Sequence, residues 1–277
     1  MFKKVFLLLI AVFIFNASFS QNVNWKKVRV LVYTKNGEGY VHENIPFAAK
    51  AIQDFGKKHG FKVDTSANPA IMIESNLKKY TMLIFTSTNN DVFDTDAQRL
   101  AFRRYIEAGG GFVGIHSVTG TERKWEWFKM MLGGTFSWHP RFQKFTVRVI
   151  NTGHPSMKGT PAVWEKEDEC YFAKEIYPGP QTLMVNDFST IDISNAQQKK
   201  ELAKNTENFA KFYPSVWVYN FDGGYTWCTT LGHDKKDYSD KTYLSHIWGG
   251  ISFIAGEVKK IDFTKAYATH RDDAVKF

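Results

Sequence analysis

Five histidines of this 277-residue chain stand close to glycine or proline, in segments that these residues mark as turns. They are His42, His116, His139, His154 and His233. An imidazole in a turn is not needed for packing, and it can transfer protons, bind a substrate or ligate a metal ion. The alternative for each histidine is a capping or turn-forming role.

Hydrophobic patterning in the first half indicates how some of these side chains are positioned. Short apolar runs predict strands, and apolar residues at helical spacing predict helices. The predicted strands cover residues 28–33, 61–64, 82–85 and 112–115, and the predicted helices cover residues 42–60 and 95–108. Strands that alternate with helices of this length predict a parallel sheet with helices on both faces.

Ligands bind such sheets at the carboxyl ends of the strands. The loops at those ends cover residues 33–42, 86–91 and 116–120, so His42 and His116 lie at the predicted ligand edge. His233 follows a later predicted strand, and we expect it to join the same site. No short metal-binding motif such as HExxH is present. Zinc or another divalent metal ion on these three histidines is therefore a hypothesis that rests on topology.

The second half predicts further strands in a less regular order. They cover residues 145–150, 182–185, 215–219 and 226–231, with a hairpin turn at 221–225 and a closing helix at 243–255. Residues 186–210 are polar, and we interpret them as an excursion from the sheet or a lid.

The start of the chain predicts a signal peptide over residues 1–20. Lys3 and Lys4 precede an apolar run at residues 5–15, and Ser18-Phe19-Ser20 has the small-x-small pattern of a cleavage site. The apolar run is too short to span a bilayer. We therefore expect export to a periplasm or out of the cell, with a mature chain of residues 21–277 that has no membrane segment.

Composition narrows the classes of partner. The formal net charge is +8, but the basic residues are scattered, so we expect no nucleic-acid partner. Cys170 and Cys228 either form a disulfide or remain buried thiols. The chain holds 24 Phe, 12 Tyr and 8 Trp, and some of these aromatic rings could serve as platforms for sugar rings.

Several segments, taken in order, resemble the ThuA-like (trehalose-utilisation) family across about residues 28–255. They are 40–43 (Tyr-Val-His-Glu), 109–117 (Gly-Gly-Gly-Phe-Val-Gly-Ile-His-Ser), 133–136 with His139-Pro140, 168–171 (Asp-Glu-Cys-Tyr) and 229–233 (Thr-Thr-Leu-Gly-His). The resemblance implies a single α/β domain with the flavodoxin-like fold of class I glutamine amidotransferases. It also implies a small-molecule carbohydrate substrate, such as a disaccharide or its keto form, and a partner sugar dehydrogenase.

In the amidotransferases a sharp elbow after a strand presents a cysteine nucleophile beside backbone N–H groups. His116 occupies the corresponding position here, with Ser117 next to it, and no cysteine lies within fifty residues on either side. Cysteine-dependent glutamine hydrolysis is therefore not expected. Ser117 could instead act as the nucleophile, with His116 or His233 as its base.

Three functions fit these residues. In the first, the protein is an enzyme in which His116 is a general acid or base, His42 and His233 assist it, and substrate contacts come from His139, Asp168, Glu169 and Tyr171. In the second, it is a sugar-binding module in which Trp125, Trp127 and Trp138 stack on the ligand. In the third, it is a zinc-dependent hydrolase. Asp168 and Glu169 could otherwise form a solvated acidic turn, and the tryptophans could otherwise pack in the core.

Overall fold

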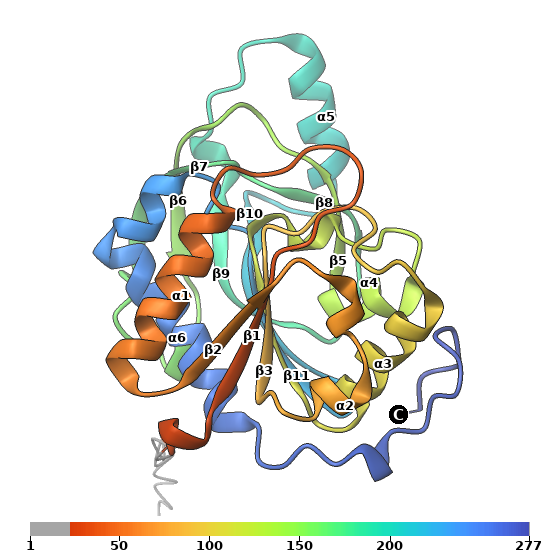
Figure 1. The fold of residues 1–277 in the computed structure, drawn as a ribbon. Coiled ribbons are helices and arrows are strands. Elements are labelled where there is room, and N and C mark those ends of the chain that lie inside the picture. Colours follow the sequence, from red (N-terminus) through yellow and green to blue (C-terminus); the bar gives the residue numbers. More distant parts are fainter. Residues whose placement is uncertain (1–22, 277) are drawn as a thin grey trace, which may run out of the picture.

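The computed structural model describes residues 23–276, so the predicted signal peptide lies outside the described residues. A nine-stranded sheet, with the strand order β2-β1-β3-β4-β11-β10-β9-β6-β7, runs through this part of the chain (Figure 1). No helix between residues 23 and 276 is both long enough and apolar enough to cross a bilayer.

The first five strands in this order are parallel, which confirms the α/β fold expected from the sequence. They are β2 (Lys62–Ser66), β1 (Arg29–Tyr33), β3 (Met82–Thr86), β4 (Gly111–Ile115) and β11 (Gly224–Thr229). The helices that connect the first four strands are α1 (Ile45–His59), α2 (Glu74–Leu77) and α3 (Asp96–Glu107). Thr95 caps α3, and it forms a reciprocal capping box with Gln98.

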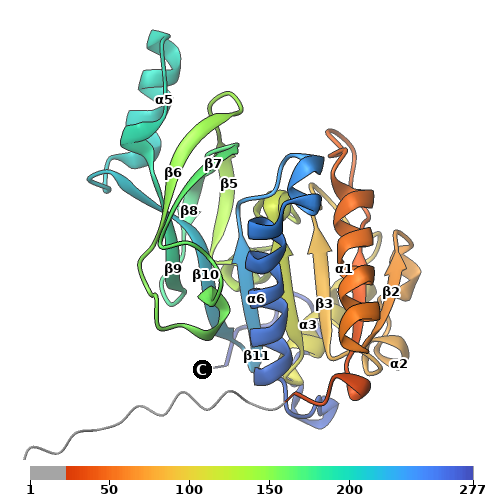
Figure 2. The same ribbon diagram turned by 90° about the vertical axis from the view of Figure 1, so that its left-hand side faces the viewer.

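Helices cover both faces of the parallel strands because successive side chains alternate in direction. Val30 and Val32 of β1 pack in the core under α1 and α6 (Lys241–Glu257), the face seen in Figure 2. Leu31 and Tyr33 pack in the opposite core with α3 and α4 (Glu126–Leu132). Burial on both faces explains why β1, β3 and β4 read as continuous apolar runs, whereas the edge strand β2 is only partly buried.

The remaining strands of the large sheet are antiparallel to their neighbours. They are β10 (Phe212–Phe221), β9 (Gln181–Asp187), β6 (Gln143–Val149) and β7 (Val163–Asp168). The predicted hairpin turn joins β10 to β11, with positive φ at Asp222 and Gly223. Within the predicted excursion, α5 (Ala196–Thr206) projects from this half of the molecule (Figures 1 and 2).

Three strands were not predicted: β7 and the two strands of a small separate sheet, β5 (Gly134–Trp138) and β8 (Phe172–Ile176). β7 was missed because its buried positions are polar. Lys166 and Asp168 face inward, while Glu165 and Glu167 on either side of Lys166 are exposed. Alternation of apolar and polar residues, the usual signal of a half-buried strand, is absent from such a segment.

Two alternatives left open by the sequence are decided by burial. Cys170 and Cys228 are both free and fully buried, so they form no disulfide, and burial raises the pKa of both thiols. Trp125 and Trp127 are 1% and 3% exposed within the core, so the interpretation of these two rings as sugar platforms is wrong. The ring of Trp138 stacks on the ring of Phe172, and the two ring centres are 5.7 Å apart.

We expect Gly249→Ala to destabilise the protein by about 1–3 kcal/mol, because an added Cβ would lie 2.1 Å from the Ser156 carbonyl oxygen. This direction opposes helix propensity, which favours alanine over glycine by about 1 kcal/mol. Urea unfolding measures the change, with Lys241→Ala at an exposed position of the same helix as the control. A Gly249→Ala protein as stable as the wild type would show that α6 does not pack this closely.

Candidate functional site

His116 stands at the sharp turn that follows β4. Its φ is +58°, a value that residues other than glycine seldom adopt and that is enriched at functional sites. It begins a short 3-10 helix, His116–Gly120, and its side chain is fully buried. Its Nδ1 lies 3.0 Å from the Thr230 carbonyl oxygen, which can only accept a hydrogen bond. His116 therefore carries a proton on Nδ1, and its Nε2 faces the cluster, where the Tyr171 hydroxyl lies 3.1 Å away.

His42 reaches the same place from the loop after β1. Its Nδ1 lies 3.3 Å from the Ser117 hydroxyl, which donates to the Thr88 carbonyl oxygen at 3.1 Å. Because the Ser117 hydroxyl donates its proton to Thr88, it can only accept a hydrogen bond from Nδ1–H of His42. The Nε2 lone pair of His42 is therefore available to a ligand. Burial, with the neighbouring His116 and His233, lowers the pKa of His42 to about 3, so the ring is neutral.

Glu169 and His233 complete the cluster. The Glu169 Oε2 atom lies 3.0 Å from His233 Nδ1 and 3.5 Å from His116 Nε2. Burial alone would raise the pKa of Glu169, but its contacts with His116 and His233 hold that pKa well below its ordinary value. Burial likewise opposes the charge on His233, yet Glu169 raises the pKa of His233 overall.

The predicted trio of histidines is thus brought together, with a carboxylate that sequence reasoning had assigned to substrate binding. One ligand atom from each of His42, His116, Glu169 and His233 lies within 4.8 Å of the others. Histidines that ligate metals usually donate their other ring nitrogen to an oxygen acceptor, as His42 and His116 do here. Nitrogen and carboxylate donors suit zinc and other first-row divalent ions.

Asp168 positions this cluster from behind. Its carboxylate accepts hydrogen bonds from the backbone N–H groups of Gly232 at 2.7 Å and His233 at 3.1 Å, and it pairs with Lys166 at 3.1 Å. Asp168 is completely buried and Glu169 is 8% exposed, so the interpretation of these residues as a solvated acidic turn is wrong. Asp168 therefore holds the His233 loop and does not face the cavity.

A cavity of about 350 Å³ opens over the cluster. His139 and Tyr171, both expected at the substrate site, line it: the Tyr171 hydroxyl is 3.1 Å from His116 Nε2, and His139 Nε2 is 3.5 Å from Glu169 Oε1. His154 lies elsewhere, where its Nδ1 accepts from the Ser156 N–H at a short 3-10 helix. A second cavity of about 230 Å³ shares Tyr40 and His233 with the first.

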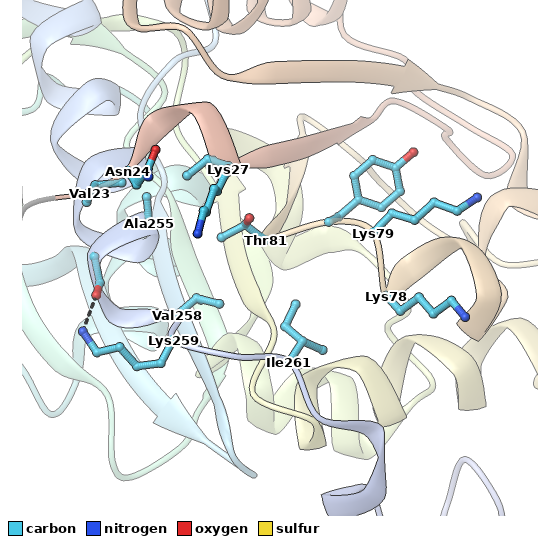
Figure 3. Close-up of a pocket in the computed structure, with 13 residues that line it drawn as sticks. Val23, Asn24, Lys27, Lys78, Lys79, Thr81, Ala255, Val258, Lys259 and Ile261 are labelled. Carbon is cyan, nitrogen blue, oxygen red and sulfur yellow. Dashed lines mark hydrogen bonds between the residues drawn. The ribbon is translucent and has the colours of Figure 1, made fainter.

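A larger cavity, of about 480 Å³, lies where the chain enters β1 and β3, beside the end of α6 (Figure 3). Its polar side chains are mainly lysines, of which Lys259 donates to the Gly256 carbonyl oxygen at 2.8 Å. The described residues that line it include no histidine and no carboxylate. Without groups that transfer protons near neutral pH or ligate a metal ion, this cavity is a weaker candidate for a catalytic site than the one over His116.

Sequence reasoning missed several residues of the main cavity wall, namely Tyr40, Asn89, Gly120, Arg123 and Phe136. Tyr40, Asn89 and Gly120 belong to the three loops predicted to form the ligand edge, which was the signal that could have identified them. Arg123 and Phe136 lie beyond those loops. Phe136 belongs to the segment 133–136 that carries part of the family resemblance, whereas no sequence pattern places Arg123 at the site.

We expect Asp168→Asn to cost about 3 kcal/mol or more, because an amide leaves Lys166 with one fewer buried anion and places an N–H group against backbone donors. Urea unfolding measures the loss, and Glu167→Gln, an exposed charge on the same strand, is the matched control. A change within about 0.5 kcal/mol, typical of a surface substitution, would contradict this role of Asp168.

Comparison with known proteins places the chain in a family. The pattern of the ThuA family, described as trehalose utilisation, matches residues 29–254. A ThuA-like protein from Bacteroides uniformis is similar in structure, with a TM-score of 0.67, 23% identity, and coverage of 83% of this chain and 92% of that one. A ThuA-like protein from Parabacteroides merdae gives a TM-score of 0.61 at 17% identity, with coverage of 84% of this chain and 92% of that one.

A more distant likeness supports the amidotransferase-like fold. A protein from Thermoplasma acidophilum, described as part of a GMP synthase, gives a TM-score of 0.50 at 11% identity, with coverage of 82% of this chain and 94% of that one. No curated protein matches the sequence at a significant level. These likenesses concern the fold alone, whereas the family match spans most of the sequence, and the chain therefore belongs to the ThuA family.

Proposed function

We propose that this protein is an exported enzyme that holds a divalent metal ion on His42, His116, Glu169 and His233 and acts on a carbohydrate or its keto form. The convergence of four ligand atoms within 4.8 Å at a cavity carries the proposal. The Glu169 Oε2 atom is buried, and its polar neighbours are His233 Nδ1 at 3.0 Å and His116 Nε2 at 3.5 Å, so the carboxylate offers this oxygen at the same point as the ring nitrogens.

A metal ion at this place would polarise a carbonyl group or lower the pKa of bound water. The side chains around it would move protons. His139 donates from Nδ1 to the Pro140 carbonyl oxygen at 2.7 Å and faces Glu169 with Nε2, so both ring nitrogens face oxygen acceptors. His139 could therefore act as a general acid, with the Tyr171 hydroxyl as a second donor.

Two features support a sugar as the substrate. Tyr40, Phe136 and Tyr171 line the main cavity, and aromatic side chains with polar edges suit the apolar faces and hydroxyls of sugar rings. The adjoining 230 Å³ cavity, which shares Tyr40 and His233, gives room for a second ring. The family description, trehalose utilisation, concerns a disaccharide as well.

Glutamine hydrolysis by a cysteine is disfavoured. The elbow carries His116, and both cysteines are buried thiols whose pKa is raised by burial. A thiol becomes a nucleophile only as the thiolate.

We expect tag-free protein to bind about one zinc, manganese or other first-row divalent ion per chain, measured by elemental analysis and calorimetry. Glu169→Gln and His233→Ala should each weaken binding by roughly 100-fold or more, because each removes a ligand. His270→Ala, an exposed histidine in the C-terminal segment, is the matched control. A stoichiometry near zero in the wild type, with no binding of any of these ions, would refute the metal site.

We expect the mature protein to consume trehalose, another disaccharide or a 3-keto derivative in a reaction that chelation stops. His116→Ala should abolish turnover while its circular dichroism spectrum stays native, because His116 lies at the centre of the cluster. Mass spectrometry and NMR identify the product and the bond or carbon that changes. Tight sugar binding without product in any metal condition would instead indicate a non-catalytic binding module.

A keto-sugar substrate would require a sugar dehydrogenase as a partner that supplies it. The proposed export predicts that protein recovered outside the cytoplasm begins at Gln21, after cleavage at Ser20. N-terminal sequencing tests this, and an intact Met1 in the recovered protein would contradict it.

A further inference from the structure

Arg123 lines the main cavity from the segment that follows the elbow. Its Nε donates to the Gly120 carbonyl oxygen at 2.9 Å, and Nη2 donates to Asn89 Oδ1 at 3.1 Å. The guanidinium carbon lies 5.4 Å from the centre of the Phe136 ring. Two hydrogen bonds and an aromatic face therefore fix the plane of this half-buried cation at the cavity wall.

Arg123 differs from every other arginine of the chain because no carboxylate of the described residues lies near it. The other seven each have a carboxylate oxygen within 4.0 Å; they are Arg29, Arg99, Arg103, Arg104, Arg141, Arg148 and Arg271. No carboxylate among the described residues comes that close to Arg123. Its neighbour Glu122 is already used, because it pairs with Arg99 and accepts from the backbone N–H groups of Val92 and Phe93.

The cavity itself offers Arg123 no anion either. Glu169 is the one carboxylate among the described residues that line it, and this side chain is shared by His116, His139 and His233. Removal of an unpaired cation from water is unfavourable, and burial accordingly lowers the pKa of Arg123. A guanidinium has five N–H groups, and two are used here, so three remain for a ligand.

We propose that Arg123 binds an oxyanion of the substrate, so that the carbohydrate is an acidic one, with a carboxylate or an ester phosphate. The proposal deepens the function proposed above and rests on it for the sugar, but Arg123 is not a metal ligand. An arginine fork matches both anions through paired hydrogen bonds. A divalent ion in the same cavity as Arg123 would outweigh the single charge of Glu169 and make the cavity strongly attractive to an anion.

The test compares sugars that differ in charge on one ring. Calorimetry on the metal-loaded mature protein would use glucose as the neutral probe, glucuronate as the carboxylate probe and glucose 6-phosphate as the phosphate probe. We expect one of the two anions to bind at least about 10-fold more tightly than glucose, because only the anions form charge-assisted hydrogen bonds with the guanidinium. The anion that binds more tightly identifies the source of the charge.

Variants assign the preference to Arg123. Arg123→Met keeps the apolar contact with Phe136 and should remove the preference for the anion, while Arg123→Lys should retain part of it. Arg141→Met, which alters an exposed arginine, is the matched control. Metal affinity should be unchanged in all three variants, and that measurement separates a lost oxyanion site from a lost metal site.

Equal affinity for glucose and both anions would overturn the proposal, as would an anion preference that survives in Arg123→Met. Should Arg123→Met fail to fold, Arg123→Lys still tests the proposal. An anion preference in Arg123→Lys as strong as that of the wild type would then contradict it. Anion binding that depends on Arg123 in a protein without metal affinity would support the oxyanion site and refute the metal-dependent function.

Discussion

One buried carboxylate surrounded by imidazoles organises the ligand edge of this protein. Glu169 contacts His116, His139 and His233, and the packing of the whole edge brings these rings to it. A carboxylate in this position is stable only with positive charge or hydrogen-bond donors around it. The same requirement applies to the adjacent acid, Asp168, which is satisfied by Lys166, by the backbone N–H of Glu169 and by the loop that carries His233.

The cluster forms where the two halves of the sheet contribute to one place. β4 and the loop after β1 supply His116 and His42 from the parallel half. Glu169 arrives from the far side, directly after β7 at the antiparallel edge. The antiparallel strands therefore do more than cover the core. They supply Glu169, which is the one acidic residue of the cluster.

The elbow illustrates how a fold is reused for different chemistry. By the family resemblance, His116 stands where class I amidotransferases expose a cysteine at a sharp turn. Its φ is +58°, and the Thr230 carbonyl oxygen holds a proton on its Nδ1. At this strained position the chain offers a ring nitrogen to the cluster, and Ser117, beside it, orients His42.

Local patterns in the amino-acid sequence were enough to predict the parallel half, its helices and the meeting of three histidines at one edge. These features follow from hydrophobic periodicity and from the rule that parallel strands end at one edge. The elbow at His116 was expected from the family resemblance. The folded chain was needed to reveal Glu169 as the fourth member, the burial of Trp125 and Trp127, and the unpaired charge of Arg123. Each of these depends on which distant segments meet. The pairing of β6 with β7 sets which side chains of β7 face inward, and a shift of one residue would reverse them.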